Sequence, residues 1–159
     1  GEVDIEDGLP VARYEQADAG YFGAELSADA TFNKFLGGFV SAYVVRAKLV
    51  DLDLNLPRIS PARIRSGLDF RYKNLNVRPE AVFASRQDKV YPLERPTAGY
   101  GIFNVAGSYT IGSQHYAHVF TFNAYNLTDK LYRNHLSFIK ELAPEMGRGI
   151  RFGYTIRFF

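Results

Sequence analysis

The chain has 159 residues, enough for one domain, and it contains no cysteine, which excludes a disulfide scaffold and a thiolate metal site. Its formal net charge is +2, and the basic residues are spread along the chain, which does not favour a nucleic-acid partner. No run of about 18 apolar residues is present, so a transmembrane helix is excluded as well. A membrane β-barrel is not excluded, because strands that alternate apolar and polar residues are only mildly hydrophobic on average.

The first part of the chain predicts a loop and then two strands joined by a short turn. Residues 1–10 are acidic and show no period, and no signal peptide is visible there, so an exported protein would carry further residues upstream. From about Val11 the chain is expected to extend, with its clearest alternation over residues 22–32. A glycine-containing turn over residues 33–38 leads to a second strand over residues 39–49.

A third strand, residues 63–72, has the sharpest alternation in the chain and follows a long loop over residues 51–61. One of its faces is apolar and the other is largely charged, with Ile64, Ser66, Leu68, Phe70 and Tyr72 against Arg63, Arg65, Gly67, Asp69 and Arg71. After a turn at residues 73–74, the sequence predicts a weaker fourth strand over about residues 75–90. Its Pro79 cannot donate a hydrogen bond to a strand ladder.

The remaining residues predict three more strands. A loop over residues 91–99 precedes a fifth strand over residues 100–111, and a turn over residues 112–115 leads to a sixth strand over about residues 116–132. A last long loop reaches the final strand, residues 147–159. That strand has one apolar face and one small or cationic face, with Ile150, Phe152, Tyr154, Ile156 and Phe158 against Gly149, Arg151, Gly153, Thr155 and Arg157.

Together these elements predict an all-β chain of about seven strands in sequential antiparallel hairpins, in which short turns alternate with long loops. Outer-membrane barrels have short turns on the periplasmic side and long loops outside, whereas a soluble sandwich has no reason to sort its connections in this way. The strands also reach the roughly 9–11 residues that a tilted crossing of the membrane requires. The sequence therefore predicts an antiparallel up-and-down transmembrane β-barrel rather than a soluble barrel.

One segment carries a resemblance to a known family. The run Asn126-Leu127-Thr128-Asp129-Lys130-Leu131-Tyr132 is similar to the penultimate strand of TonB-dependent outer-membrane receptors. The residues from Pro144 to Arg148 resemble the proline and Gly-Arg pattern that precedes the last strand of that family. Gly23-Ala24-Glu25-Leu26 and the segment from Leu56 to Arg63 resemble two further family segments.

The resemblance implies that residues 1–159 are the C-terminal part of a larger, 22-strand type of barrel. The plug domain and the earlier strands of such a receptor are not in this sequence. The whole protein would take up a ferric siderophore, haem or another metal chelate across the outer membrane of a Gram-negative bacterium. Its implied partners are outer-membrane lipid, the rest of the barrel and the plug, the TonB complex through the missing plug, the barrel-assembly machinery and the metal-chelate ligand, with no nucleic acid.

In such a barrel the polar faces of the strands would line the lumen. The residues concerned carry charges at neutral pH: Glu25, Asp29, Arg63, Arg65, Asp69, Arg71, Arg151 and Arg157. Two interpretations stay open. These side chains contact the plug or an anionic metal chelate in transit, or they form a solvated barrel interior whose charges pair with one another.

His135, Glu141 and Glu145 lie on the last long loop, where ligand contacts are expected in receptors of this family. The alternative is a solvated loop that binds no ligand. His115 and His118 fall near a short turn at the opposite end, so they do not combine with His135. Because the sequence shows no metal-ligand spacing, it predicts neither a metal site nor a cofactor.

Two groups of mainly aromatic residues have expected roles in the membrane. The terminal residues Tyr154, Ile156, Phe158 and Phe159 resemble the outer-membrane assembly signal, although an apolar face of an edge strand would look alike. In the family the last Phe usually lies in phase with the apolar face, whereas here Phe158 does so and Phe159 follows it. Phe39, Tyr43, Tyr100, Tyr125 and Tyr132 are predicted to lie at the membrane interface, with simple strand packing as the alternative.

The sequence does not predict an enzyme. It lacks a Gly-x-Ser-x-Gly motif, a phosphate-binding glycine loop and a pair of carboxylates in an apolar setting. Two other functions stay open, namely a small self-contained outer-membrane barrel with a structural or adhesive role, and a soluble lipocalin-like barrel that binds a small apolar ligand. The sequence identifies neither the ligand nor the oligomeric state.

Overall fold

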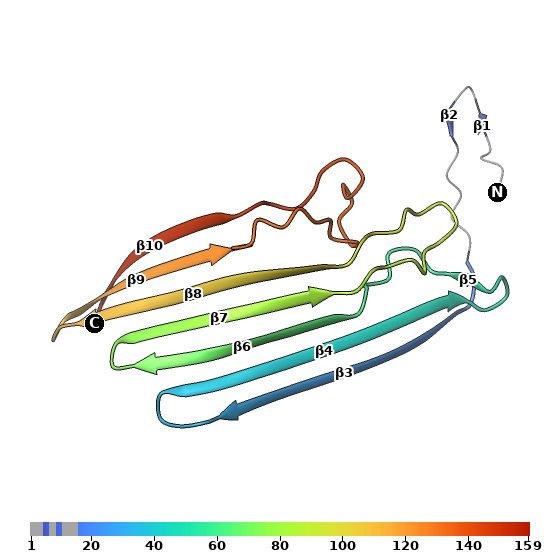
Figure 1. Cartoon of the computed structure of the whole chain (residues 1–159). Coiled ribbons are helices and arrows are strands. Elements are labelled where there is room, and N and C mark those ends of the chain that lie inside the picture. Colours follow the sequence, from blue (N-terminus) through green and yellow to red (C-terminus); the bar gives the residue numbers. More distant parts are fainter. Residues whose placement is uncertain (1–4, 7–8, 11–15) are drawn as a thin grey trace.

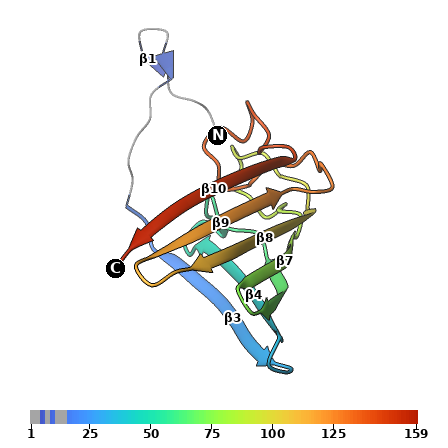
Figure 2. The same cartoon turned by 90° about the vertical axis from the view of Figure 1, so that its left-hand side faces the viewer.

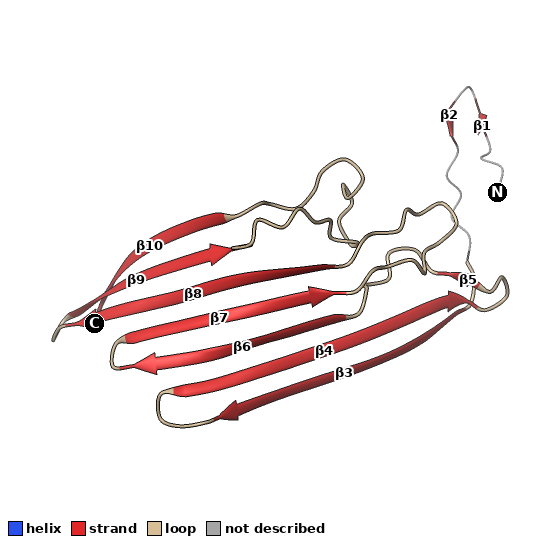
Figure 3. Ribbon diagram, in the orientation of Figure 1, coloured by secondary structure: helices blue, strands red, loops and turns tan. Residues whose placement is uncertain are grey.

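The computed structural model describes residues 5–6, 9–10 and 16–159. Seven long strands form one antiparallel sheet in the order β10-β9-β8-β7-β6-β4-β3, so neighbours in the sheet are also neighbours in the sequence (Figure 1). None of the described residues forms a helix, and so none there could span a membrane as a helix (Figure 3). The sheet is twisted, with β3 and β10 at its two margins (Figure 2).

The strands of the sheet have the following bounds: β3 Ala19–Thr31, β4 Leu36–Leu49, β6 Arg63–Tyr72, β7 Leu75–Ala84, β8 Tyr100–Gly112, β9 Tyr116–Tyr125 and β10 Gly149–Phe158. The two-residue strand β5, Leu54–Asn55, extends β4 at its far end. Two further short strands, β1 (Ile5–Glu6) and β2 (Leu9–Pro10), pair with each other. The seven long strands confirm the number that the alternation predicts.

Four expectations about element bounds need correction. The turn expected over residues 33–38 ends earlier, because β4 begins at Leu36 and Gly37 and Gly38 are paired within it. The fourth predicted strand ends at Ala84 rather than near residue 90, because residues 85–99 turn away from the sheet and are bridged at Gln87 and Thr97. The sixth ends at Tyr125 rather than near residue 132, because Asn126 adopts a positive φ of 48° that a strand does not allow. The predicted loop over residues 1–10 contains β1 and β2, and the expected extension from Val11 lies outside the described residues.

The strand register assigns every side chain to one of two faces. In an antiparallel sheet, paired residues point to the same side, so the pairs Leu36–Phe70 and Ile64–Phe83 place their side chains together. The same rule continues from strand to strand and produces one continuous apolar face from β3 to β10. The predicted apolar residues of the final strand, from Ile150 to Phe158, all lie on it.

No layer of described residues covers this apolar face. Phe70 is 40% exposed and Phe152 80% exposed, although both are large apolar side chains. The few buried apolar side chains are small or of medium size, and register places them on the opposite, polar face: Ala47, Val82, Ala84, Ile102 and Ala117. The sheet is therefore a single layer with its apolar side outward.

The prediction that Phe39, Tyr43, Tyr100 and Tyr125 lie at a membrane interface on the apolar face is wrong. Register places all four on the polar face, where Phe39 lies opposite Gly67 and Tyr43 lies opposite Arg63. Alternation along a single strand cannot show this, because the inward side of these strands also carries aromatic rings. Tyrosines on the apolar face gather instead toward the short turns: Tyr72, Tyr109, Tyr116 and Tyr154.

Leu68→Arg and Asp69→Asn form a matched pair that tests this assignment of faces. Leu68 is 45% exposed on the apolar face near the middle of β6, and Asp69 follows it on the polar face. In a bilayer, Leu68→Arg is expected to lower the free energy of unfolding by about 2–4 kcal/mol, because a guanidinium would meet hydrocarbon. Asp69→Asn should cost much less. Equilibrium unfolding in lipid vesicles measures both, and the reverse order would invert the faces.

Candidate functional site

The two ends of the sheet differ in how the strands are connected. At one end the connections are only residues 32–35, 73–74 and 113–115, whereas at the other end residues 50–62, 85–99 and 126–148 form long loops (Figure 1). This confirms the predicted alternation of short and long connections. The long loops lie side by side and are joined by side-chain contacts, so this end is the candidate site.

A cluster of three ionisable residues lies buried between two of the long loops. Glu94 from the β7–β8 loop accepts a hydrogen bond from the Lys140 ammonium at 2.7 Å between Nζ and Oε1. The side chains of Glu94 and Lys140 are 10% and 9% exposed. His135 from the β9–β10 loop is 2% exposed and places its Nε2 3.1 Å from the same Glu94 oxygen, without the alignment of a hydrogen bond. This cluster fastens the two loops together.

The surroundings of His135 define which nitrogen carries its proton. Lys140 Nζ lies 3.3 Å from His135 Nδ1 and Thr97 Oγ1 lies 3.0 Å from it. Because an ammonium group can only donate, Nδ1 is an acceptor, and the proton of the neutral ring is on Nε2, facing Glu94. Burial and the Lys140 charge lower the pKa of His135 below its usual 6.5, which outweighs the opposing attraction of Glu94.

Arg58 connects the third long loop to the same cluster. Its backbone N–H donates to Glu94 Oε2 at 3.0 Å, and its guanidinium donates to the carbonyl of Leu136 at 2.7 Å. The guanidinium also lies over the Phe138 ring, 3.2 Å from the ring centre. Although burial alone would raise the pKa of Glu94, hydrogen bonds from Lys140 and the Arg58 backbone lower it overall. All three long loops are thus held around one carboxylate.

The segment that carries the family resemblance forms the start of the β9–β10 loop. Asn126 is 2% exposed, and its amide nitrogen donates to the carbonyls of Lys130 at 2.9 Å and Met146 at 3.2 Å. Its side-chain oxygen accepts from the Lys130 N–H at 2.9 Å. Asp129 Oδ1 accepts from the Arg148 N–H at 2.8 Å, and Tyr132 packs against Tyr100 with the rings tilted and their centres 4.3 Å apart. Asn126 and Asp129 thus connect the start of the β9–β10 loop to its end, before β10 begins, and Tyr132 connects the loop to β8.

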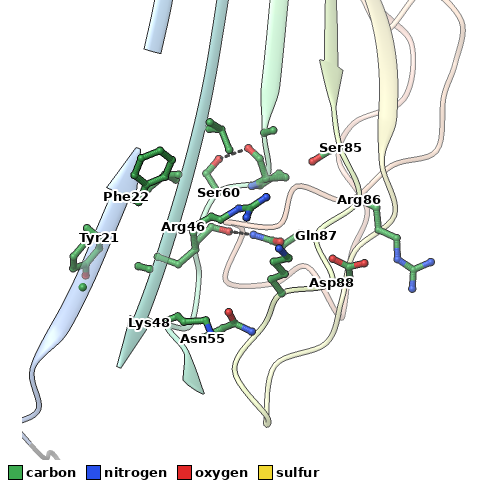
Figure 4. A pocket seen from close by; sticks show the side chains of 18 residues that line it. Tyr21, Phe22, Arg46, Lys48, Asn55, Ser60, Ser85, Arg86, Gln87 and Asp88 are labelled. Atoms are coloured by element: carbon green, nitrogen blue, oxygen red, sulfur yellow. Dashed lines mark hydrogen bonds between the residues drawn. The ribbon is translucent and has the colours of Figure 1, made fainter. Parts of the chain in front are cut away.

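A hollow of about 620 Å³ opens beside the joined loops, between the ends of β3 and β4 and the segments 59–62 and 85–89. Figure 4 shows Tyr21 and Arg46 on one side of it and the segment from Ser85 to Asp88 on the other. Gln87 closes one wall, because its amide donates to the carbonyl of Ile59 at 2.8 Å. The lining has more cationic than anionic side chains, namely Arg46, Lys48, Arg86 and Lys89 against Asp88, although Lys48 is paired with Asp53 at 2.6 Å. Such a lining suits an anionic ligand.

The charged residues predicted to line a lumen all lie on the polar face of the sheet. They are Glu25, Asp29, Arg63, Arg65, Asp69, Arg71, Arg151 and Arg157. Two have partners on the neighbouring strand. Arg65 Nε donates to Glu80 Oε2 at 2.6 Å, and Asp69 Oδ1 lies 3.7 Å from Arg78 Nε.

Sequence reasoning missed Arg78 and Glu80 as members of this polar face. Glu80 Oε1 also accepts a hydrogen bond from the Asn104 side-chain nitrogen at 3.3 Å. The side-chain oxygen of Asn104 in turn accepts from the Asn126 N–H at 3.0 Å, so a chain of contacts crosses from β6 to the β9–β10 loop. Arg78 lies 4.1 Å from the centre of the Phe39 ring. The alternation of Asn76, Arg78 and Glu80 was the available signal, but Pro79 between them weakened the strand assignment.

The structure places the three predicted ligand residues in different surroundings. His135 is buried in the loop cluster described above. Glu141 is exposed, with its carboxylate 3.4 Å from Arg95 Nε, and Glu145 is half-buried beside Tyr132, whose pKa is raised by burial and by that carboxylate. The three side chains therefore do not converge on one point. Among the residues that the structure describes, no group of three or more His, Cys, Asp or Glu side chains could hold a metal ion.

Glu94→Gln is expected to loosen all three loops. It removes the charge that compensates Lys140 at a site where both side chains are about nine-tenths buried, and such a loss costs about 3 kcal/mol. Hydrogen exchange of the loop amides measures the effect as reduced protection. Glu141→Gln is the matched control, because the Arg95–Glu141 pair is exposed and should contribute less than about 1 kcal/mol. Equal effects of the two variants would contradict the buried cluster.

The loops are expected to loosen as the pH falls. In the packed loops the pKa of His135 is below 6.5, so the opened loops bind a proton that the packed loops exclude. Packing should be fully stable above pH 6.5 and should weaken below it, with a second loss below pH 4.5, where Glu94 in the opened loops binds a proton that the packed loops still exclude. Hydrogen exchange corrected for intrinsic rates measures this. His135→Gln should abolish the first step, whereas His115→Gln at the short-turn end should retain it.

Comparison with known proteins gives the fold its context. No protein-family model and no curated protein sequence matches this chain. A solved structure does match, that of the copper transporter OprC, with a TM-score of 0.72 and 23% sequence identity. The match covers 89% of this chain and 24% of that protein, so this chain spans about a quarter of the transporter's length.

A likeness at this level of identity defines the fold. It confirms the predicted fold class, an all-β antiparallel meander that corresponds to part of a large outer-membrane barrel. The motif at Asn126 and the short and long connections fit the same architecture. The chain has the fold of a barrel segment of an outer-membrane transporter, as its resemblance to TonB-dependent receptors implies.

Proposed function

We propose that this chain is the C-terminal barrel portion of a TonB-dependent transporter in the outer membrane of a Gram-negative bacterium. The observation that carries the proposal is the uncovered apolar face, which runs across all seven long strands. Most charged strand residues share the opposite face, and the exceptions Arg46 and Lys48 lie at the loop end of β4. A soluble protein would leave this area in contact with water, at a large hydrophobic cost. A bilayer removes that cost.

The two margins of the sheet support a larger barrel. In the described part of the chain, β3 pairs only with β4 and β10 pairs only with β9. In lipid, each unpaired backbone group costs several kcal/mol, so both margins need partner strands. We assign these partners to the remainder of the barrel, and the terminal Tyr154, Ile156, Phe158 and Phe159 to a signal for the barrel-assembly machinery.

The polar face would then surround the transport path. In this proposal the eight charged residues predicted for it line the lumen and meet the plug domain or the passing ligand. Arg65 and Asp69 are already paired with Glu80 and Arg78, and these contacts would keep the wall of the lumen rigid. Energy coupling would act through the plug and the TonB complex rather than through this segment.

The long-loop end would capture the ligand. We propose a metal or a metal chelate, in keeping with the copper transporter that shares the fold. The cationic hollow near Arg46 and Arg86 suits an anionic chelate such as a ferric siderophore or haem. Glu141 and Glu145 are the loop residues proposed to contact it directly, and His135 would join the ligand only after the loops open.

Energised uptake by the complete protein tests this function. Cells that carry the protein should accumulate a radiolabelled metal chelate, and a protonophore or loss of the TonB complex should abolish accumulation while leaving binding at the cell surface intact. A double variant, Arg46→Gln with Arg86→Gln, should weaken binding of an anionic chelate because it removes two positive charges from the hollow. Accumulation that is independent of energy would contradict the proposal and would indicate a passive or structural barrel.

A further inference from the structure

The short-turn end of the sheet has a charge distribution unlike that of the loop end. Its three connections contain Lys34, Lys73 and His115 and no acidic residue. The long loops at the other end contain basic residues and also acidic ones, including Asp53, Glu94 and Glu141. The connections at the short-turn end therefore carry only basic groups, while Asp29 and Asp69 lie with Lys34 and Arg71 around a hollow just behind the β3–β4 turn.

Two lysines at this end flank a pair of aromatic rings. Lys34 Nζ lies 4.8 Å from the centre of the Phe35 ring, and Lys73 Nζ lies 5.4 Å from the centre of the Tyr72 ring. The two rings lie 5.4 Å apart, so the turns β3–β4 and β6–β7 are brought together through them. The ammonium groups are thereby held at the short-turn end of the sheet.

The backbone of both turns keeps these lysines in place. Asn33 Oδ1 accepts hydrogen bonds from the N–H groups of Phe35 at 2.8 Å and Leu36 at 3.1 Å, which fixes the β3–β4 turn. Lys73 adopts a positive φ of 51° in the two-residue β6–β7 turn, a conformation that directs the chain sharply back. The lysines are thus presented by short, defined turns.

The apolar face carries several tyrosines toward the short-turn end, with Tyr72 and Tyr109 beside the β6–β7 turn and Tyr116 beside the β8–β9 turn. Tyr72, Tyr109, Tyr116 and Tyr154 are between 40% and 54% exposed there. The Tyr154 hydroxyl lies 2.6 Å from His118 Nδ1, and the Tyr116 ring packs against the edge of the same histidine. Tyrosines with an apolar ring and a polar end mark the level of lipid headgroups. The two lysines lie at this same end of the sheet.

We propose that Lys34 and Lys73, held by the Phe35–Tyr72 pair, bind the headgroup phosphate of an anionic phospholipid in the leaflet that the short turns meet. This inference rests on the proposed membrane location. It names a binding partner for the short-turn end of the barrel, which is the end opposite the ligand site. An ammonium group beside an anionic surface gains about fivefold in affinity per residue at moderate salt. Binding to phospholipid of that leaflet would fix how deeply the short-turn end sits in the bilayer.

The test uses the complete protein reconstituted into phosphatidylcholine vesicles with and without phosphatidylglycerol, each doped with a photoreactive lipid of the matching headgroup. After illumination, mass spectrometry locates the lipid adducts. Adducts on the peptides that contain Lys34 and Lys73 should be at least about fivefold more abundant with the anionic headgroup, and high salt should reduce the excess. The double variant Lys34→Gln with Lys73→Gln should remove it.

Lys130→Gln with Arg148→Gln, two exposed cations of the β9–β10 loop, forms the matched control and should leave the excess unchanged. Equal adducts with both headgroups, or an excess that persists in the Lys34 and Lys73 variant, would overturn the inference. If the protein inserts and transports normally in that case, the proposed function stands. Failure of the protein to insert into either kind of vesicle would overturn both.

Discussion

Hydrogen bonding between neighbouring strands is the constraint on which the rest of this structure depends. A strand in hydrocarbon cannot satisfy its backbone groups with water, so each must pair with the strand beside it. The register from β3 to β10 meets this need through sequential hairpins, and it also decides which side chains face outward. A shift of β6 by one residue would turn charges such as Arg65 and Arg71 toward the apolar face.

The loop end is organised by a different interaction. Three connections meet around the Glu94 carboxylate, which receives contacts from Lys140, His135 and the Arg58 backbone. Buried charges of this kind contribute geometric definition more than net stability. The sheet therefore sets the positions where the loops begin, and the cluster sets how the loops lie relative to one another.

How much of the structure could be predicted from the sequence depends on how far apart in the chain the interacting residues lie. Alternation within β6 and β10 is local, so it predicted their faces correctly. Turn residues predicted the reversal at residues 73–74, whereas Gly37 and Gly38, expected in a turn, lie within β4. The inward position of Phe39 and Tyr43 depends on register with β6, which no single strand contains. The approach of Glu94 to His135 depends on two loops meeting in space. Periodicity carries no information about such long-range contacts.

The direction of the two marginal strands has a geometric consequence. β3 and β10 are the first and last of seven alternating strands, so they run the same way along the sheet. Joining them directly would create a parallel pair in an otherwise antiparallel cylinder. Any closure that keeps neighbours antiparallel throughout must insert an odd number of strands between them, and this parity rule applies whichever polypeptide supplies those strands.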